Sequence, residues 1–202
     1  MNELILIIYI ISLLAILLFS GHGFIMLYLA GKIEDVREKI PGEFNDNPYV
    51  TIQLPIYNEM YVVERLLDAV CNIEYDKAYM EIQVLDDSTD ATVEIVEKKI
   101  IEKKSKGFNI VHIRRQSRTG YKAGALREGL KIAKGDFFAI FDADFVPKTN
   151  FLNSTLPHFN NKRIGMVQTR WEHLNKDYSL LTKLQAAALD AHFYIDQESK
   201  NK

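Results

Sequence analysis

Two hydrophobic patterns divide this chain. Residues 4–30 contain no Asp, Glu, Lys or Arg, and as a helix they would be about 40 Å long against a hydrocarbon core of roughly 30 Å. After residue 48, short apolar runs alternate with stretches whose apolar residues recur at helical spacing. The first pattern predicts one transmembrane helix within residues 1–31, and the second predicts a globular domain after it.

The charges that flank the apolar segment predict its orientation. No Lys or Arg precedes Lys32, whereas Lys32, Arg37 and Lys39 follow the segment directly. Because positive charge stays on the cytoplasmic side, the domain after the helix is expected in the cytoplasm. A cleaved signal peptide would have a basic start and a shorter apolar core, so we expect a retained membrane anchor. Residues 32–48, with their Pro, Gly and Asn residues, are expected to be a polar connector.

The alternation after residue 48 predicts an α/β domain. Apolar residues at helical spacing occur in 62–70, 93–101 and 125–133, between runs that are typical of buried strands. Helices between successive strands indicate βαβ units and a mainly parallel sheet. A further helix is expected over 180–194. The predicted strands are 50–54, 81–85, 109–113, 137–141 and 164–169.

Composition narrows the function classes. The formal net charge of -2 gives no reason to expect a nucleic-acid partner. Cys71, the only cysteine, falls on the apolar face of a predicted helix, so neither a disulfide nor a cysteine metal site can form within the chain. A single buried cysteine agrees with a cytosolic domain.

Polar residues collect where the predicted strands end. In open α/β sheets, ligands bind beyond the carboxyl ends of the strands, so these residues are expected to converge on one pocket. Carboxylates, arginines and an aromatic ring together indicate a nucleotide-diphosphate site, although no glycine-rich phosphate loop of the dinucleotide or Walker type is present. The residues are Pro55, Tyr57 and Glu59 after the first strand, Asp86 and Asp87 after the second, Arg115 and Arg118 after the third, and Asp142 and Asp144 after the fourth.

Asp142 and Asp144 form the most specific feature of this group. On an extended backbone, residues at i and i+2 point to the same side, so both carboxylates could face one hard cation. Such a pair after a buried strand could hold a metal-bound diphosphate. By itself, an Asp-x-Asp sequence also fits an ordinary boundary between a strand and a turn.

Four motifs in order resemble a known family. LPIYNE (54–59), VLDDS (84–88), RTGYKAGAL (118–126) and FDAD (141–144) are similar to those of the processive family 2 glycosyltransferases of cellulose synthase-like type. The stretch from VQTRW (167–171) to LLT (180–182) resembles the glucomannan 4-beta-mannosyltransferase branch. The resemblance begins near residue 48 and runs to the last residues. It implies a GT-A, Rossmann-like nucleotide-sugar-binding fold, Mg²⁺ or Mn²⁺ as cofactor, and inverting transfer of a hexose from UDP-glucose or GDP-mannose to a growing β-glycan.

The resemblance also implies roles for individual residues. Pro55, Tyr57 and Glu59 would line the nucleoside site, and either Asp87 or Asp86 would bind the base or ribose.

At the phosphate end, Lys122 would face the diphosphate from the start of a helix, where backbone N–H groups also favour an anion. Arg118 and Arg115 could face phosphates or lie on the surface. Asp144 would hold the metal, with Asp142 contacting the ribose or the metal.

The resemblance leaves part of the family's machinery unaccounted for. The general base of the family is the Asp of a Thr-Glu-Asp motif, which this sequence lacks, and the acceptor-side Gln-x-x-Arg-Trp motif is absent as well. The sequence QTRW (168–171) lacks one residue of that spacing, and we interpret it as a strand end that packs Trp171 against the sheet. We therefore expect a donor-binding core in 49–170, the start of an acceptor half in 171–202, and a base beyond Lys202 in a larger enzyme.

Two alternative functions stay open at this point. The same donor fold serves enzymes that transfer a sugar to a lipid, and the acceptor half would distinguish them. The chain could also be a non-catalytic, membrane-tethered donor-binding subunit. All three hypotheses predict a membrane and a nucleotide sugar as partners, and the leading one adds a glycan acceptor.

Overall fold

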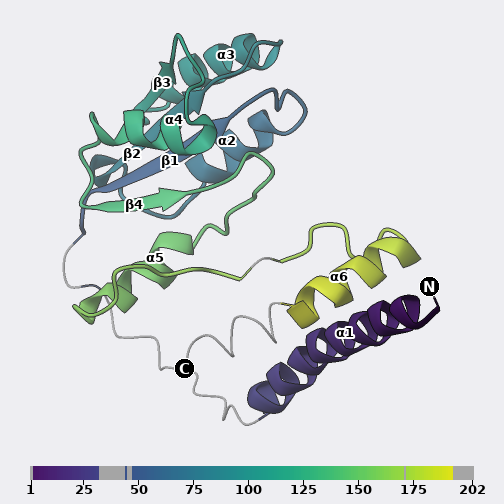
Figure 1. Ribbon diagram of the computed structural model, residues 1–202. Helices are drawn as coiled ribbons and strands as arrows, with labels where there is room; N and C mark the ends of the chain where they lie inside the picture. The colour runs from purple at the N-terminus through teal and green to yellow at the C-terminus, as the bar shows by residue number, and fades with distance from the viewer. Residues whose placement is uncertain (1, 32–43, 45–46, 171, 193–202) are drawn as a thin grey trace. The chain divides into compact units, whose positions relative to one another are not determined.

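The computed structural model describes residues 2–31, 44, 47–170 and 172–192 (Figure 1). The chain forms two units: Ile40–Val167, and Met1–Lys39 together with Gln168–Lys202. Most of the predicted connector, and also Trp171, lie outside the described residues.

The first unit contains a sheet of four parallel strands (Figure 1). They are β1 (Val50–Ile56), β2 (Met80–Asp86), β3 (Ile110–Arg114) and β4 (Phe137–Ile140), in the order β3-β2-β1-β4. The parallel α/β architecture and the first four predicted strands are confirmed. Since all four strands are parallel, their carboxyl ends meet at one edge of the sheet.

Helices cover both faces of this sheet. On one face, α2 (Val63–Cys71) and α3 (Thr92–Ser105) pack over the apolar side chains of the strands. On the other face lies α4 (Tyr121–Leu130). Shorter helical segments complete the unit: η1 (Lys77–Tyr79), α5 (Phe151–Thr155) and η2 (Leu156–Asn160).

The two faces of the sheet differ in chemistry because side chains alternate along each strand. Val50, Ile52 and Leu54 of β1 belong to the apolar core under α2 and α3. The face under α4 instead carries buried polar side chains. They bond across β1 and β2: the Thr51 hydroxyl donates to Glu81 Oε1 at 2.6 Å, and Gln53 Nε2 donates to Gln83 Oε1 at 3.0 Å. Each buried polar atom of these two pairs therefore has a partner, as burial requires.

Two details of the sequence prediction are wrong. Residues 164–169 form no regular secondary structure, and β4 ends one residue early, at Ile140. No described strand pairs with 164–169, and Met166 is 79% exposed. A run of β-prone residues becomes a strand only when a neighbouring strand takes up its backbone hydrogen bonds, and here none does.

The second unit contains two described helices, α1 (Asn2–Gly31) and α6 (Leu180–His192). Within α1, residues Glu3–Gly21 are long and apolar enough to cross a membrane, a test that an N-terminal signal sequence also passes. The end of α6 falls inside the helix predicted over 180–194, and residues 193–194 lie outside the described part of the chain.

Candidate functional site

A cleft of about 450 Å³ lies at the carboxyl edge of the sheet. It is bounded by the loops that follow β1, β2, β3 and β4 and by the first turn of α4. Every predicted site residue except Asp86 and Arg115 lines it. The lining residues are Pro55, Ile56, Tyr57, Glu59, Leu85, Asp87, Arg118, Lys122, Ala125, Asp142, Ala143 and Asp144.

The loops after β1 and β2 are locked to each other at one end of the cleft. Asn58 has a φ of 56°, in the left-handed region that Asn tolerates better than most residues. Its backbone N–H donates to Ser88 Oγ at 2.9 Å, and its side-chain oxygen accepts from the Thr89 N–H at 2.9 Å. These bonds fix the loop that carries Tyr57 and Glu59, so Asn58 is a supporting residue that the sequence analysis named only as part of a motif.

Asp86 faces away from the cleft. Its side chain is fully buried, accepting from the Ser88 N–H at 2.8 Å and lying 2.8 Å from His112 Nε2 of β3. Burial raises the pKa of this carboxyl, but the hydrogen bonds with His112 and Ser88 outweigh burial and hold the pKa below its usual value. Of the two neighbouring carboxylates, only Asp87 is placed to meet a ligand in the cleft.

The alternation of side chains along a strand explains why Asp87 and not Asp86 lines the cleft, and it could have predicted this difference. Asp86 has the parity of Val84, which faces the apolar core, whereas Asp87 has the parity of Leu85, which lines the cleft under α4. Pro55 and Tyr57 share that parity on the neighbouring strand and its loop.

Arg115 binds Asp87 instead of facing the cleft. Its Nε donates to Asp87 Oδ1 at 2.9 Å, and its Nη2 donates to Asp87 Oδ2, so the pair is bidentate. The pKa of Arg115 is raised by the hydrogen bond with Asp87. This contact follows from the strand order, which puts β3 beside β2.

The first turn of α4 supplies the opposite wall. Gly120 and Tyr121 have φ angles of 73° and 48°, so the chain turns through two left-handed residues where the helix begins. A Cβ at Gly124 would lie 2.1 Å from the Thr119 carbonyl oxygen. Glycine is therefore required at Gly124, because the loop before α4 folds directly against the helix. This arrangement places Lys122 in the first turn of α4, at the cleft.

Charged groups of the cleft pair with one another. The Lys122 ammonium forms an ion pair with Asp142 Oδ1, and both side chains are about half exposed. The guanidinium carbon of Arg118 lies 3.3 Å from the centre of the Tyr57 ring and 5.1 Å from that of Tyr121. Tyr121 is a second aromatic neighbour that the sequence analysis did not single out.

Asp142 and Asp144 lie on a turn rather than on the extended backbone that we expected. The Phe145 N–H donates to the Asp142 carbonyl at 3.1 Å, which closes the turn directly after β4. Both side chains nevertheless line the cleft. Within the described residues there is no group of three or more His, Cys, Asp or Glu side chains that could hold a metal ion. Two carboxylates fit a divalent cation only if ligand and water oxygens complete its coordination, as is common for Mg²⁺ at phosphate sites.

Comparison with known proteins gives consistent matches. The model of the family "Glycosyl transferase family 2" matches residues 51–201. Glucomannan 4-beta-mannosyltransferase 9 of Arabidopsis thaliana is 41% identical over 172 residues, which cover 83% of this chain and 32% of that protein. A probable glucomannan 4-beta-mannosyltransferase 2 of Oryza sativa subsp. japonica is 46% identical over 157 residues, covering 75% of this chain and 27% of that protein. The chain thus spans about a third of the length of these relatives.

A solved structure shows the same fold. The mannosyltransferase PcManGT from Pyrobaculum calidifontis, in complex with GDP-Man and Mn²⁺, superposes with a TM-score of 0.62 at 25% identity, covering 79% of this chain and 44% of that one. The parallel sheet with its flanking helices is a GT-A fold, and the chain belongs to glycosyl transferase family 2.

Proposed function

We propose that this chain forms the donor-binding part of a membrane-anchored, inverting glycosyltransferase that adds a hexose from a nucleotide sugar to a growing β-glycan. The observation that carries this proposal is the convergence of eight side chains, chosen from sequence alone, on one cleft. They are Pro55, Tyr57, Glu59, Asp87, Arg118, Lys122, Asp142 and Asp144.

The two ends of the cleft suit the two ends of a nucleotide sugar. Tyr57, Glu59 and Asp87 offer an aromatic ring and carboxylates that can accept from the N–H and O–H groups of a nucleoside. Lys122 and the N-terminus of α4 offer positive charge to a diphosphate. Arg118, now held over Tyr57, is the second cationic side chain that lines the cleft.

Negative charge grows on the diphosphate when the sugar leaves, and the cleft is built to stabilise it. A bound Mg²⁺ or Mn²⁺, held by Asp144 and Asp142, would neutralise this charge as a Lewis acid. Lys122 must then release Asp142 and turn to the phosphates. These 202 residues contain no Thr-Glu-Asp sequence, and the proposal assigns the general base to none of them.

GDP-mannose is the donor that we favour over UDP-glucose. The curated relatives are named glucomannan mannosyltransferases, and PcManGT was solved with GDP-Man and Mn²⁺. The membrane anchor in the proposal is α1, supported by its length and apolar composition. If α1 is an anchor, membranes washed at alkaline pH should retain the chain; its release by that wash would overturn the anchor.

Calorimetry of the full chain in detergent or nanodiscs tests donor binding. We expect GDP-mannose to bind in the presence of Mn²⁺, and we expect Asp144→Asn to weaken that binding at least about 100-fold, or about 2.7 kcal/mol. The matched control is Asp136→Asn, which removes an exposed carboxylate at the opposite end of β4 and should bind as the unchanged chain does.

Binding of neither GDP-mannose nor UDP-glucose would contradict the proposed function. Binding that Asp144→Asn leaves unchanged would contradict the assigned metal site.

A further inference from the structure

Arg115 is nearly buried beside the donor cleft, yet it does not line the cleft. We infer that Arg115 is a positioning residue that couples the nucleoside end of the donor site to its phosphate end. This inference rests on the proposed function, because it assigns Arg115 a part in binding the nucleotide diphosphate.

The first contact of Arg115 orients Asp87. The fork from Nε and Nη2 to the two carboxylate oxygens restricts rotation of the carboxylate, and the two side chains are only 12% and 7% exposed. Each oxygen keeps a lone pair that can accept from a ligand. Arg115 therefore sets the direction in which Asp87 meets a base or ribose, without itself touching the ligand.

The second contact holds the loop before α4. Arg115 Nη1 donates to the Thr119 carbonyl at 2.9 Å, and Nη2 donates to the Tyr121 carbonyl at 3.1 Å. These two carbonyls flank Gly120, in the left-handed turn that starts the helix. Because Gly124 packs directly under the Thr119 carbonyl, the position of the loop fixes where α4 begins.

A single planar group joins these two regions. Arg115 makes four hydrogen bonds from three nitrogen atoms, two to Asp87 and two to the turn at which α4 begins. Lysine keeps the charge but has one nitrogen and no fork, so it cannot make both sets at once. Asp87 at the nucleoside end and Lys122 at the phosphate end are thus placed relative to each other through one guanidinium.

The test compares two ligands with the full chain in nanodiscs: GDP, which has a nucleoside and a diphosphate, and inorganic pyrophosphate, both with Mn²⁺. For Asp87→Asn we expect GDP affinity to fall about tenfold and pyrophosphate affinity to change less than about twofold. Arg115→Lys should weaken GDP about 30-fold and pyrophosphate about fivefold, because it disturbs both ends. The double variant should bind GDP about as weakly as Arg115→Lys alone, because the two residues act as a unit.

Two controls separate positioning from general destabilisation. Arg127→Lys changes an exposed arginine in the last turn of α4 and should alter neither affinity. Val70→Ala truncates a fully buried residue of α2, so it should lower the unfolding temperature while both affinities stay unchanged. If Arg115→Lys fails to fold, Arg115→Gln takes its place in the same assay beside Asp87→Asn, and the same criteria apply.

The possible outcomes are distinct. GDP binding by Arg115→Lys within twofold of the unchanged chain overturns the inference and leaves the proposed function intact. The inference is also overturned if Arg115→Lys weakens GDP binding but not pyrophosphate binding. The same holds if the loss of GDP affinity in the double variant equals the product of the losses in the two single variants. If the unchanged chain binds neither ligand, both the proposed function and this inference fail.

Discussion

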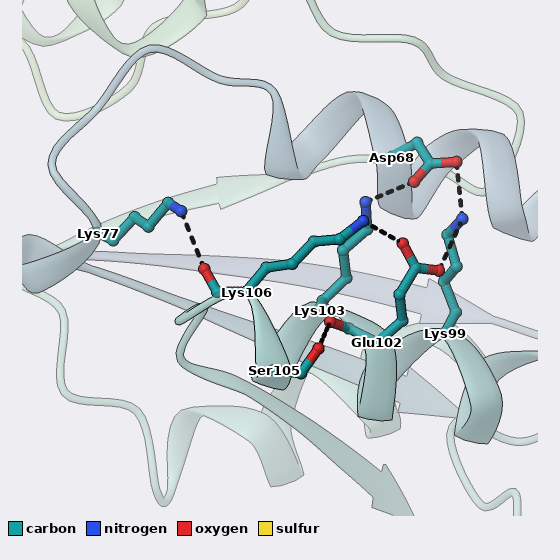
Figure 2. A network of polar contacts seen from close by, with 7 residues as sticks. All are labelled: Asp68, Lys77, Lys99, Glu102, Lys103, Ser105 and Lys106. Atoms are coloured by element: carbon teal, nitrogen blue, oxygen red, sulfur yellow. Dashed lines mark hydrogen bonds and ion pairs between the residues drawn. The ribbon is translucent and has the colours of Figure 1, made fainter.

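One ion pair at the cleft, Lys122 with Asp142, differs from a cluster of ion pairs between α2 and α3 in how deeply the side chains are buried. At the cleft, Lys122 and Asp142 pair with side chains that are 51% and 42% exposed. Between α2 and α3, Asp68 pairs with Lys99 and Lys103, whose side chains are only 13% and 8% exposed (Figure 2). We call this cluster between α2 and α3 the helix seam. Figure 2 also shows Glu102 bound to Lys99 and Lys106 there.

The difference indicates which pairs stabilise the fold and which can bind a ligand. Lysines that are mostly buried need the Asp68 carboxylate, because an unpaired charge would be desolvated without compensation. Burial raises the pKa of Asp68, but hydrogen bonds with Lys103 and Lys99 outweigh it and lower the pKa below its usual value. At the cleft, water or a ligand can replace either partner at little cost. The cleft pair is therefore exchangeable, and the seam pairs are structural.

The largest expected effect comes from backbone packing beside the cleft. Gly124→Ala places a Cβ 2.1 Å from the Thr119 carbonyl and 2.7 Å from Arg115 Nη1. We expect it to lower the free energy of unfolding by about 1–3 kcal/mol, and GDP binding should weaken as well, because the loop has to move. Urea titration and calorimetry measure the two effects. The matched control is Gly165→Ala, where an added Cβ meets nothing within 4 Å; an equal loss of stability there would contradict the packing argument.

The next effect tests whether the cleft pair is exchangeable. Lys122→Met should change the free energy of unfolding by less than about 0.5 kcal/mol, because the pair is exposed. GDP-mannose affinity with Mn²⁺ should fall about tenfold, or about 1.4 kcal/mol, since a cation for the diphosphate is lost. Mn²⁺ alone should bind at least as well as before, because Asp142 is released.

The control for this prediction is Lys131→Met, at the far end of α4, where Lys131 pairs with Glu128. A loss of stability in Lys122→Met without a loss of donor affinity would make the cleft pair structural and remove the contrast with the helix seam.

The fold could be predicted from sequence because its signals are local. Alternating helical and strand patterns gave four strands within a few residues of their observed bounds, and the rule for parallel sheets brought their polar ends together. The strand predicted at 164–169 was wrong because its signal is not local. A strand there would need a partner strand, and sequence periodicity does not reveal whether one is present.

Within the site, the identity of the residues was predictable but their partners were not. Strand parity separates Asp86 from Asp87, so that distinction was available from the sequence. The bond between Arg115 and Asp87 joins loops that are 28 residues apart, and it depends on the strand order together with the left-handed turn at Gly120. Motif order shows which residues belong to the cleft, whereas three-dimensional packing decides which of them contact the ligand and which hold the others.

The smallest expected effect is at the helix seam. Asp68→Asn removes the carboxylate that two mostly buried lysines share, although Lys99 keeps Glu102, and we expect a loss of about 1 kcal/mol, reduced by the 44% exposure of Asp68 itself. Donor affinity should not change, because the seam lies on the face of the sheet opposite α4. Glu97→Gln, an exposed substitution on α3, is the matched control and should change neither quantity. If Asp68→Asn weakened donor binding, the helix seam and the cleft would not be independent of each other.

The pH dependence of this loss tests its electrostatic cause. The pKa of Asp68 is lower in the folded chain than its usual value of 3.8, so its contribution to stability is present above that value. It disappears as the pH falls through the folded pKa, because the carboxyl is then protonated in both states. Urea titrations should therefore give a constant difference between the unchanged chain and Asp68→Asn above about pH 5, and a shrinking one below about pH 4. If the difference is undiminished at pH 3, Asp68 acts through packing or neutral hydrogen bonds. The contrast between buried ion pairs at the helix seam and an exposed ion pair at the cleft would then not explain the stability of the seam.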